Sequence, residues 1–505
     1  MGLRTKLLWP LIACLTYLFF FTVRLKPVTD NSSELDPATI AAIEEEELRL
    51  LQQNEQDSSW QWQYIPHHQP DLEQLTANEP LETLVVPEVT YRPDEKFITF
   101  LTHSGFQNQL IQVENGILLA WYLNRTLLLP NAFLGEAFGW SNFDKLHLEH
   151  MLRDSSTTET CSEFAEGLVE WGIECPPRGR YAVLPFDEIF DLSWAKKHVR
   201  ILPRQRSDFG WLEKEFDIQR DNVPNHVNGS YRDGDILFFK GETRYDWRIF
   251  DTPRKNHRLG KYADSLDIYQ LRQRPERLLH FSSLFGTGKL PIRRPEHYEF
   301  LRNLQRSIIY RHPAVLTMAE KIVDRLGGHG NFIGLHVRSG DGWFIKALPE
   351  NVNNIISQIQ RAVESHQPGS LRAILRPTEQ RLTLDQCRHL AATQNVTLVY
   401  MATDARSPQL NPAFDPVWNL FPCTFTLDDI FSPLSSDWDT LERVVDRNSG
   451  ASLRKFLVPL VDATVASRGW FFIGSKGSTF SGYIYRLHDV FWSNEKRQQL
   501  GLEEV

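Results

Sequence analysis

The fold class follows from the stretch FIGLHVRSGDGWF, residues 332–344. The run opens with apolar residues, as in a strand that is buried on both faces of a parallel sheet. It then becomes polar, because His336, Arg338 and Asp341 lie beside two glycines. In doubly wound α/β sheets, ligands bind outside the carboxyl ends of the strands. The stretch therefore predicts an α/β fold with a ligand site where this strand ends.

Apolar strands and helices alternate elsewhere in the same way. The first block predicts a strand at 97–102, a turn at 105–109, a helix at 110–123 and a strand at 126–130. Later apolar strands are predicted at 332–338, 396–404 and 469–475. Such strands interleaved with helices indicate parallel sheets covered on both faces.

Two blocks of this kind, 96–310 and 311–495, predict two doubly wound, Rossmann-like domains that face a cleft. The middle of the chain, 135–275, is rich in Trp, Pro and charged residues and gives no order of elements.

Polar side chains also follow the last predicted strand. The segment FIGSKGSTFSGYIYR, 472–486, passes through two glycines into a helix that we expect to begin near Ser478. Free N–H groups at a helix start, together with hydroxyls, bind phosphate. Arg338 is always charged and could grip a diphosphate from the other side. A nucleotide diphosphate is the hypothesis; the alternative is that Arg338 pairs with Asp341 and the hydroxyls only cap the helix.

Four segments carry a family resemblance: GFQNQLIQVENGILLAWYLNRTLLLP, GLHVRSGD, VYMATD and FIGSKGSTFSGYIYR. They resemble, in the same order, motifs of the GDP-fucose O-fucosyltransferase superfamily, and the match covers roughly 97–130 and 311–490. The resemblance implies a GT-B architecture and an inverting transfer of fucose from GDP-fucose to a hydroxyl of a protein or glycan. It also implies no cofactor and no obligatory metal.

The resemblance gives roles to single residues on the donor side. Arg338 matches the arginine that binds the β-phosphate and stabilises the departing GDP. His336 matches the histidine beside the nucleotide, and Asp404 the aspartate expected near the guanine. The segment that holds the diphosphate and packs on the nucleotide is matched by Ser478, Thr479 and Phe480.

On the acceptor side, Asn108 matches the asparagine that lines the sugar and the acceptor, and Gly105 is placed at the GDP-fucose site. Some relatives carry a glutamate base just before a Gly-Phe pair, where this chain has Ser104. The catalytic base therefore stays open, with Asp341 and His103 as candidates.

The N-terminus predicts a membrane-bound protein. Residues 7–23 form an uncharged run flanked by basic residues, and its length is at the short end of what spans a bilayer. We predict an uncleaved type II anchor with its cytoplasmic tail at 1–26, and a stem at 27–95; a cleaved signal peptide is the alternative. The expected location is the Golgi or endoplasmic reticulum membrane, with the catalytic domain in the lumen.

The net charge, the cysteines and three short motifs narrow the classes of partner and cofactor. A net charge of −9 over 505 residues disfavours nucleic acid as the main partner. The cysteines outside the apolar run are expected to pair as Cys161–Cys175 and Cys387–Cys423, although four cysteines allow three pairings. Three motifs fall short of a cofactor or metal site: FGTGK at 285–289, DGD at 233–235 and HLEH at 147–150.

Two other functions stay open. The first is a glycosyltransferase with another nucleotide-sugar donor. The second is a non-catalytic lumenal protein that binds a sugar nucleotide or a carbohydrate. A diphosphate site favours catalysis over simple carbohydrate binding, because a lectin has no need of one.

Overall fold

The computed structural model describes residues 91–154, 161, 164–177, 179–222, 229–253, 258–340, 342–366, 381–446 and 450–499. The predicted anchor at 1–26, nearly all of the predicted stem at 27–95, and Asp341 lie outside the described residues. Within those ranges no helix combines the length and the apolar character needed to cross a bilayer.

A six-stranded sheet organises the first half of the chain, with the strand order β5-β2-β1-β10-β7-β6. Its strands are β1 (Phe97–Phe100), β2 (Thr126–Leu129), β5 (Ile201–Pro203), β6 (Ser230–Asp233), β7 (Ile236–Phe239) and β10 (Leu278–Phe281). All neighbours are parallel except the edge pair β6 and β7. The central strands β1 and β10 are buried along their whole length, as expected for apolar runs covered on both faces.

Helices cover both faces of this sheet. They are α3 (Phe106–Leu123), α4 (Phe143–Asp154), α7 (Phe186–Ile189), α8 (Ser193–His198), α9 (Phe209–Phe216), α10 (Ile268–Arg272) and α11 (Pro295–Ser307). Helix α6 (Ala165–Trp171) also belongs to this half but buries none of its residues. Side chains of α3 and α10 share one apolar cluster with the sheet, and those of α4 and α9 share another. Two small sheets add β3 (Ala132–Gly135) with β4 (Tyr181–Leu184), and β8 (Trp247–Phe250) with β9 (Asp264–Asp267).

Helix α3 begins earlier than predicted. The segment 105–109 was expected to form a turn, but the helix starts at Phe106 and only Gly105 precedes it as the N-cap. The polar residues of its first turns do not break the helix, because buried amides find backbone partners. Gln109, for example, donates to the Phe133 carbonyl at 2.8 Å and accepts from the Phe133 N–H at 3.0 Å.

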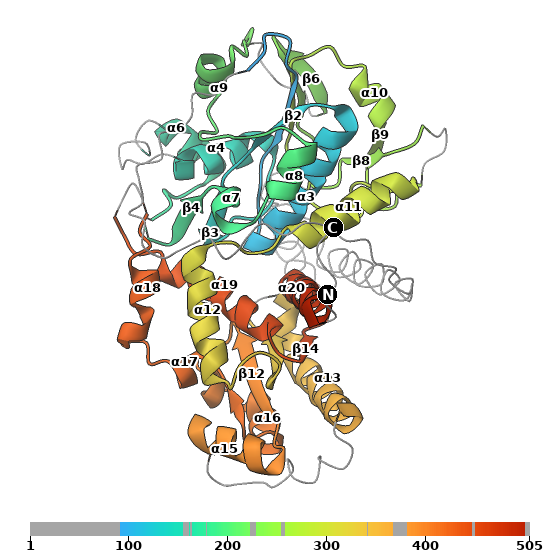
Figure 1. Cartoon of the computed structure of the whole chain (residues 1–505). Coiled ribbons are helices and arrows are strands. Elements are labelled where there is room, and N and C mark those ends of the chain that lie inside the picture. Colours follow the sequence, from blue (N-terminus) through green and yellow to red (C-terminus); the bar gives the residue numbers. More distant parts are fainter. Residues whose placement is uncertain are drawn as a thin grey trace, which may run out of the picture. The chain divides into compact units, whose positions relative to one another are not determined.

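A four-stranded, all-parallel sheet organises the second half, in the order β13-β12-β11-β14. The strands are β11 (Phe332–Val337), β12 (Leu398–Thr403), β13 (Thr424–Phe425) and β14 (Phe471–Gly474). In Figure 1 the strands β12 and β14 are orange to red, because they come later in the sequence than the blue to green strands of the first sheet. Strands β11, β12 and β14 lie within the predicted apolar runs, whereas β13 was not predicted.

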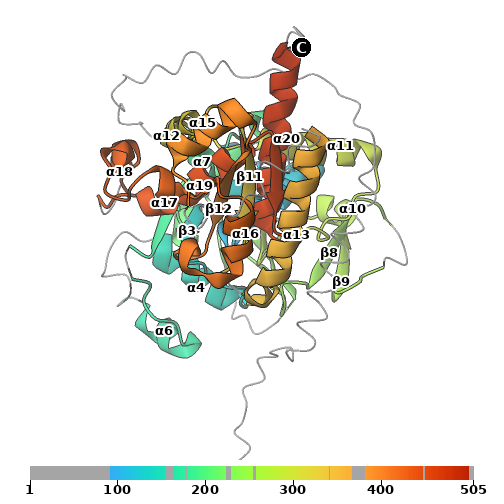
Figure 2. The same ribbon diagram turned by 90° about the horizontal axis from the view of Figure 1, so that it is seen from below.

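The helices of this half also lie on both faces of their sheet. They are α12 (Pro313–Arg325), α13 (Gly342–His366), α15 (Leu384–Gln394), α16 (Asp415–Leu420), α17 (Leu427–Ile430), α18 (Asp439–Glu442), α19 (Arg454–Ser467) and α20 (Thr479–Gln499), with short 3₁₀ turns at Pro408–Leu410, Pro412–Phe414 and Ser436–Trp438. Figure 2 shows α13 and α16 on one side of β11 and β12, with α12 on the other.

The structure confirms an α/β fold built on parallel sheets, and both cysteine pairs. Cys161 bonds to Cys175 and Cys387 to Cys423, with Cα–Cα separations of 5.9 and 5.6 Å. The described residues belong to one compact unit, in which a single apolar cluster runs from α3 to α12, α19 and α20. The predicted domain boundary near 310 stays a prediction.

Candidate functional site

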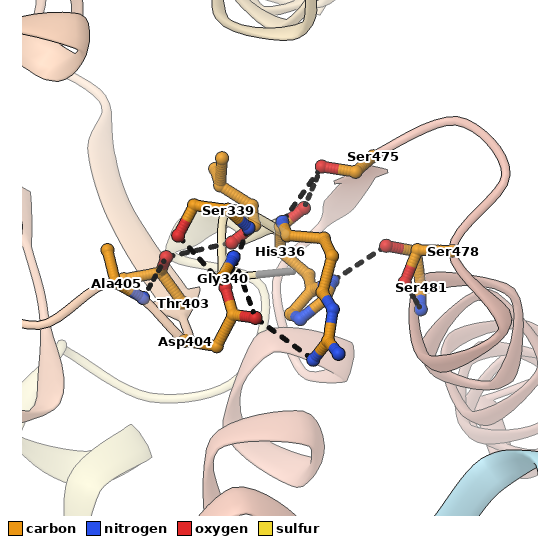
Figure 3. A network of polar contacts seen from close by, with 11 residues as sticks. His336, Ser339, Gly340, Thr403, Asp404, Ala405, Ser475, Ser478 and Ser481 are labelled. Atoms are coloured by element: carbon orange, nitrogen blue, oxygen red, sulfur yellow. Dashed lines mark hydrogen bonds and ion pairs between the residues drawn. The ribbon is translucent and has the colours of Figure 1, made fainter. Parts of the chain in front are cut away.

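The loop after β11 is held in place by a carboxylate from the end of β12. Asp404 accepts hydrogen bonds from the Ser339 N–H at 2.7 Å, the Ser339 hydroxyl at 3.0 Å and the Gly340 N–H at 3.1 Å. Its Oδ2 also lies 3.0 Å from an Arg338 guanidinium nitrogen. A Cβ at Gly340 would approach Asp404 Oδ2 to 2.7 Å, so the close approach requires glycine. Figure 3 shows Ser339 and Gly340 directed toward Asp404.

The other side of the loop is held by the residue after β14. The Arg338 N–H donates to Ser475 Oγ at 2.9 Å, and the Ser475 N–H donates to the His336 carbonyl at 3.0 Å. The strand order reverses between β11 and β14, because β12 and β13 continue on the far side of β11. A reversal of this kind leaves a ligand-binding position at the carboxyl ends of the two strands. Arg338 and Ser475 therefore lie where such a fold binds its ligand.

His336 is a buried, neutral support of this site. Its Nδ1 lies 2.7 Å from Ser481 Oγ, and its ring lies 5.0 Å from the Phe480 ring. Burial lowers the pKa of His336 to about 4; the Arg338 charge adds to this effect and Asp404 opposes it. The imidazole is therefore uncharged at neutral pH, and it ties β11 to the start of α20.

Helix α20 begins at Thr479, as the sequence predicted. Ser478 caps it, because the Ser481 N–H donates to Ser478 Oγ at 3.3 Å, while the Ser478 N–H donates to the Ser475 carbonyl at 3.2 Å. Among the described hydrogen bonds, these caps leave the N–H groups of Thr479 and Phe480 for a ligand. A helix start with free N–H groups favours an anion, and Arg338 supplies a cation nearby on β11.

The acceptor-side candidates lie at the start of α3. Gly105 is exposed, and Asn108 has a buried Oδ1 that finds no hydrogen-bond partner among the described residues. Contacts tie α3 to α20: Glu114 pairs with Arg486 at 2.6 Å, and Gln107 donates to Tyr310. The Tyr310 ring in turn lies 5.1 Å from that of Tyr483 on α20.

These contacts set the relative direction of the two helices. Gln107 precedes Glu114 on α3. Gln107 is linked through Tyr310 to Tyr483, which precedes Arg486 on α20. Both helices therefore start toward the same end. The Gly105 and Ser478 caps lie at that end, one from each sheet.

The structure brings most of the predicted donor-side residues together at the ends of β11, β12 and β14. The predicted set there is His336, Arg338, Asp404, Ser478, Thr479 and Phe480. Arg338 pairs with Asp404, and the predicted alternative partner Asp341 lies outside the described residues. Both carboxylate oxygens of Asp404 already accept bonds from protein groups, so its expected role at guanine stays a prediction.

Two further residues support the site. Ser475 binds the Arg338 backbone, and Ser481 binds His336. Figure 3 shows both directed toward the end of β11. Ser475 carries a sequence signal, because it ends a predicted apolar strand, where ligand-facing residues are expected. Ser481 carried no such signal, since its contact depends on how α20 packs.

The weak motifs have structural roles in the part of the chain described. Gly234, in DGD, adopts a positive φ of 60° in the turn between β6 and β7, and Asp233 pairs with Arg220 at 2.7 Å. His147 and His150 each lie 2.7 Å from a backbone carbonyl. No group of three or more His, Cys, Asp or Glu side chains in the described ranges is placed to hold a metal ion.

Solved structures of fucosyltransferases show a distant likeness. A POFUT1 structure in complex with GDP is 14% identical, covering 79% of this chain and 96% of that one, with a TM-score of 0.36. NodZ α-1,6-fucosyltransferase soaked with GDP-fucose is 14% identical, covering 78% and 92%, with a TM-score of 0.34. NodZ from Bradyrhizobium is 15% identical, covering 77% and 92%, with a TM-score of 0.32.

A search of curated proteins found no match. The family model described as GDP-fucose protein O-fucosyltransferase, in contrast, matches residues 97–491, which include both sheets and every described site residue. The chain belongs to the GDP-fucose protein O-fucosyltransferase family.

Proposed function

We propose that the protein transfers fucose from GDP-fucose to a hydroxyl of a protein or glycan acceptor, with inversion at the anomeric carbon. The observation that carries this proposal is the position of Arg338. Its backbone is fixed by Ser475 and its guanidinium is held by Asp404, at the point where the second sheet reverses its strand order. The start of α20 lies at the same sheet edge.

This arrangement suits a departing diphosphate. As the bond between fucose C1 and the β-phosphate oxygen breaks, negative charge develops on GDP. Arg338 can donate two parallel hydrogen bonds to phosphate oxygens, and the N–H groups of Thr479 and Phe480 can add to them. A fixed cation and a helix start together supply the stabilisation that a metal provides elsewhere, so we propose that no metal or other cofactor is obligatory.

The remaining residues take supporting places in the proposal. His336 and Phe480 would pack beside the nucleotide, and Ser478 would bind the diphosphate. Asp404 would lie toward the guanine, once the loop that it holds has adjusted to the donor. Gly105 and Asn108 would line the fucose and the acceptor. Asp341 remains a proposed catalytic residue without a described position.

We also propose a GT-B enzyme of two Rossmann-like domains, anchored at 1–26 as a single-pass type II protein of the Golgi or endoplasmic reticulum membrane. The two disulfides support a lumenal setting, because disulfides persist in oxidising compartments. Protease added outside intact microsomes should spare the bulk of the chain; digestion of that bulk would contradict this location.

A donor panel tests the activity. Purified protein is incubated with GDP-fucose, GDP-mannose or UDP-sugars, and released nucleotide is measured with water as the acceptor. We expect release from GDP-fucose well above a sample without protein, and little from the others. Release from another donor alone would support a different glycosyltransferase. Binding of GDP-fucose without release would support the non-catalytic alternative.

A further inference from the structure

A second polar site lies at the carboxyl end of the first sheet. The strand order reverses between β1 and β10, since β2 and β5 continue on the far side of β1. His103 and Ser104 follow β1, and Ser283 follows β10. His103 is fully buried, whereas Ser104 is partly exposed beside the open Gly105. The same topological rule that applies to Arg338 therefore applies to Ser104.

A hydrogen-bond network connects Gln112, Ser283, His103 and Ser104 at this site. The Gln112 amide nitrogen donates to the His103 carbonyl at 3.0 Å and to the Asn108 carbonyl at 3.2 Å. Its oxygen is then the acceptor for the Ser283 hydroxyl, at 3.4 Å. The Phe285 N–H donates to the same Ser283 oxygen at 3.0 Å. With its proton directed at Gln112, the Ser283 oxygen accepts its other bonds; with its proton directed at His103, Ser283 donates there instead.

The first arrangement corresponds to one of the two tautomers of His103, and it is the one that the relay requires. His103 Nε2 lies 2.8 Å from Ser283 Oγ, and in this tautomer Nε2 carries the hydrogen and donates it. Burial lowers the pKa of His103 to about 3, and the Arg244 and Lys289 charges add to this effect, so the ring is neutral. Its Nδ1 is then an acceptor, 2.8 Å from Ser104 Oγ. Ser104 must donate its hydroxyl hydrogen to His103, which leaves its oxygen lone pairs for another partner.

The backbone of Ser104 is held in a conformation that serines rarely adopt. Its φ is 67°, in the left-handed region. The Ser104 N–H donates to the Phe138 carbonyl at 2.8 Å, and its carbonyl accepts from Gln109 at 3.1 Å. Strained residues of this kind persist where the surrounding structure holds them, and they concentrate at functional sites.

We propose that Ser104 and His103 form a proton relay for the acceptor hydroxyl. The proposal rests on the proposed fucosyl transfer. The acceptor oxygen bonds to fucose C1 while the bond from C1 to the phosphate oxygen breaks, and its electron pair leaves with GDP. The acceptor's proton passes to Ser104 Oγ, and the hydroxyl proton of Ser104 passes to His103 Nδ1. The imidazolium later returns a proton to solvent through Ser104.

A weakly basic imidazole is sufficient for this reaction. The acceptor oxygen becomes strongly acidic only as its bond to C1 forms, so the relay needs no strong base. The relay also lies at the same end as the donor site. Only Gly105 separates Ser104 from the first residue of α3, and the middle of that helix is tied to α20 by the Glu114–Arg486 pair.

The substitution Ser104→Gly tests the relay with little risk to the fold. Glycine adopts positive φ freely, and this relief offsets its greater freedom in the unfolded chain. We expect a thermal midpoint close to that of the wild type, unchanged GDP affinity, and GDP release from GDP-fucose slower on the order of 10²-fold. Ser407→Gly is the matched control, because Ser407 is an exposed serine with φ 48° on a different loop. It should keep full activity.

A second variant separates proton transfer from positioning. His103→Asn can still accept the Ser104 hydrogen bond, but its amide cannot take the proton. We expect a loss as large as that of Ser104→Gly, and a double variant no slower than either single variant, since the two residues act as a unit. The relay would be contradicted if His103→Asn kept wild-type activity, or if the losses of the two single variants added in the double variant.

The tautomer provides a readout that needs no turnover. Proton–nitrogen correlation spectra of histidine-labelled protein, assigned with His103→Asn, should show the Nε2–H form of His103. The Nδ1–H form would overturn the relay. If wild-type protein and Ser104→Gly release GDP equally, the relay is wrong and the proposed function survives. If the wild type releases none from GDP-fucose, the proposed function itself fails.

Discussion

Arg338 shares its guanidinium with a carboxylate from the neighbouring strand. The sequence suggested Asp341 as a partner, because it lies three positions away. The contact that the structure shows is with Asp404, which follows β12. Adjacent parallel strands bring their carboxyl ends together, so residues far apart in sequence meet there. A half-exposed ion pair of this kind stabilises the fold little.

Arg338→Ala should lower kcat for GDP release from GDP-fucose by about 10²–10³-fold, by analogy with loss of one oxyanion donor. The contact strengthens as charge develops on GDP, so GDP affinity should fall far less than turnover. Arg338→Lys should be nearly as slow, because lysine keeps the charge but loses the planar fork. Thermal midpoint, calorimetric GDP affinity and turnover are measured on one preparation of each variant.

If Arg338 served only to stabilise the fold, the same variants should behave differently. If Arg338 only holds Asp404, the alanine variant should melt earlier while its folded fraction keeps normal turnover. That result would remove Arg338 from the catalytic machinery. It would also remove the main support for the proposed enzyme.

The junction between β14 and α20 depends on one close approach. A Cβ at Gly474 would lie 2.5 Å from the Ser481 Cβ, so a side chain there must displace the start of the helix. Ser481 binds His336, and Ser478 caps the helix next to it. The geometry of the proposed phosphate site therefore depends on this glycine.

Gly474→Ala should weaken GDP binding by at least 10-fold in calorimetry, because a misplaced helix start loses its charge-assisted hydrogen bonds to phosphate. Gly482→Ala is the control on the same helix, since a Cβ at Gly482 meets nothing within 4 Å. The control should bind GDP normally and melt no earlier, because alanine is the better helix former. Equal GDP affinity in the two variants would show that the helix start does not bind the nucleotide.

The central strands and the start of α20 could be predicted from sequence, because an apolar run flanked by glycine and polar residues is a local signal. The start of α3 was misplaced, since buried glutamines there look like turn residues until their backbone partners are known. Strands β5 and β7 of the first sheet come from the middle of the chain, where the strands are too short to show a hydrophobic periodicity. The Arg338–Asp404 contact could be predicted only from the order of the strands in the sheet, which no local sequence pattern reveals.

Buried neutral histidines make the stability of the whole molecule depend on pH. Burial lowers the pKa of His103 to about 3, and of His147 and His336 to about 4. The pKa values of His150 and His280 also lie well below the usual value, again through burial. In the unfolded chain each of these rings gains a proton near pH 6.5, so the unfolded state binds more protons between pH 4 and 6.5.

The free energy of unfolding should therefore fall as the pH drops from about 6.5 to 4, by on the order of 3 kcal/mol for a ring such as His336. Four carboxyls act in the opposite direction: burial raises the pKa of Asp154 to about 6 and of Asp462 to about 7, and it also raises the pKa of Asp246 and Asp489. The histidines outnumber them, so denaturant midpoints should decline steadily over this range. A midpoint that rises on acidification would show that the rings are charged in the folded protein.

The Arg338–Asp404 pair has a consequence for the catalytic cycle under the proposed function. A phosphate and a tethered carboxylate then compete for one cation, and the tether gives the carboxylate a fixed, high effective concentration. Part of the donor's binding free energy is spent on displacing it. After fucose has been transferred, the Asp404 carboxylate pairs with the arginine again and displaces GDP. The enzyme would thus give up affinity for its donor in exchange for rapid product release.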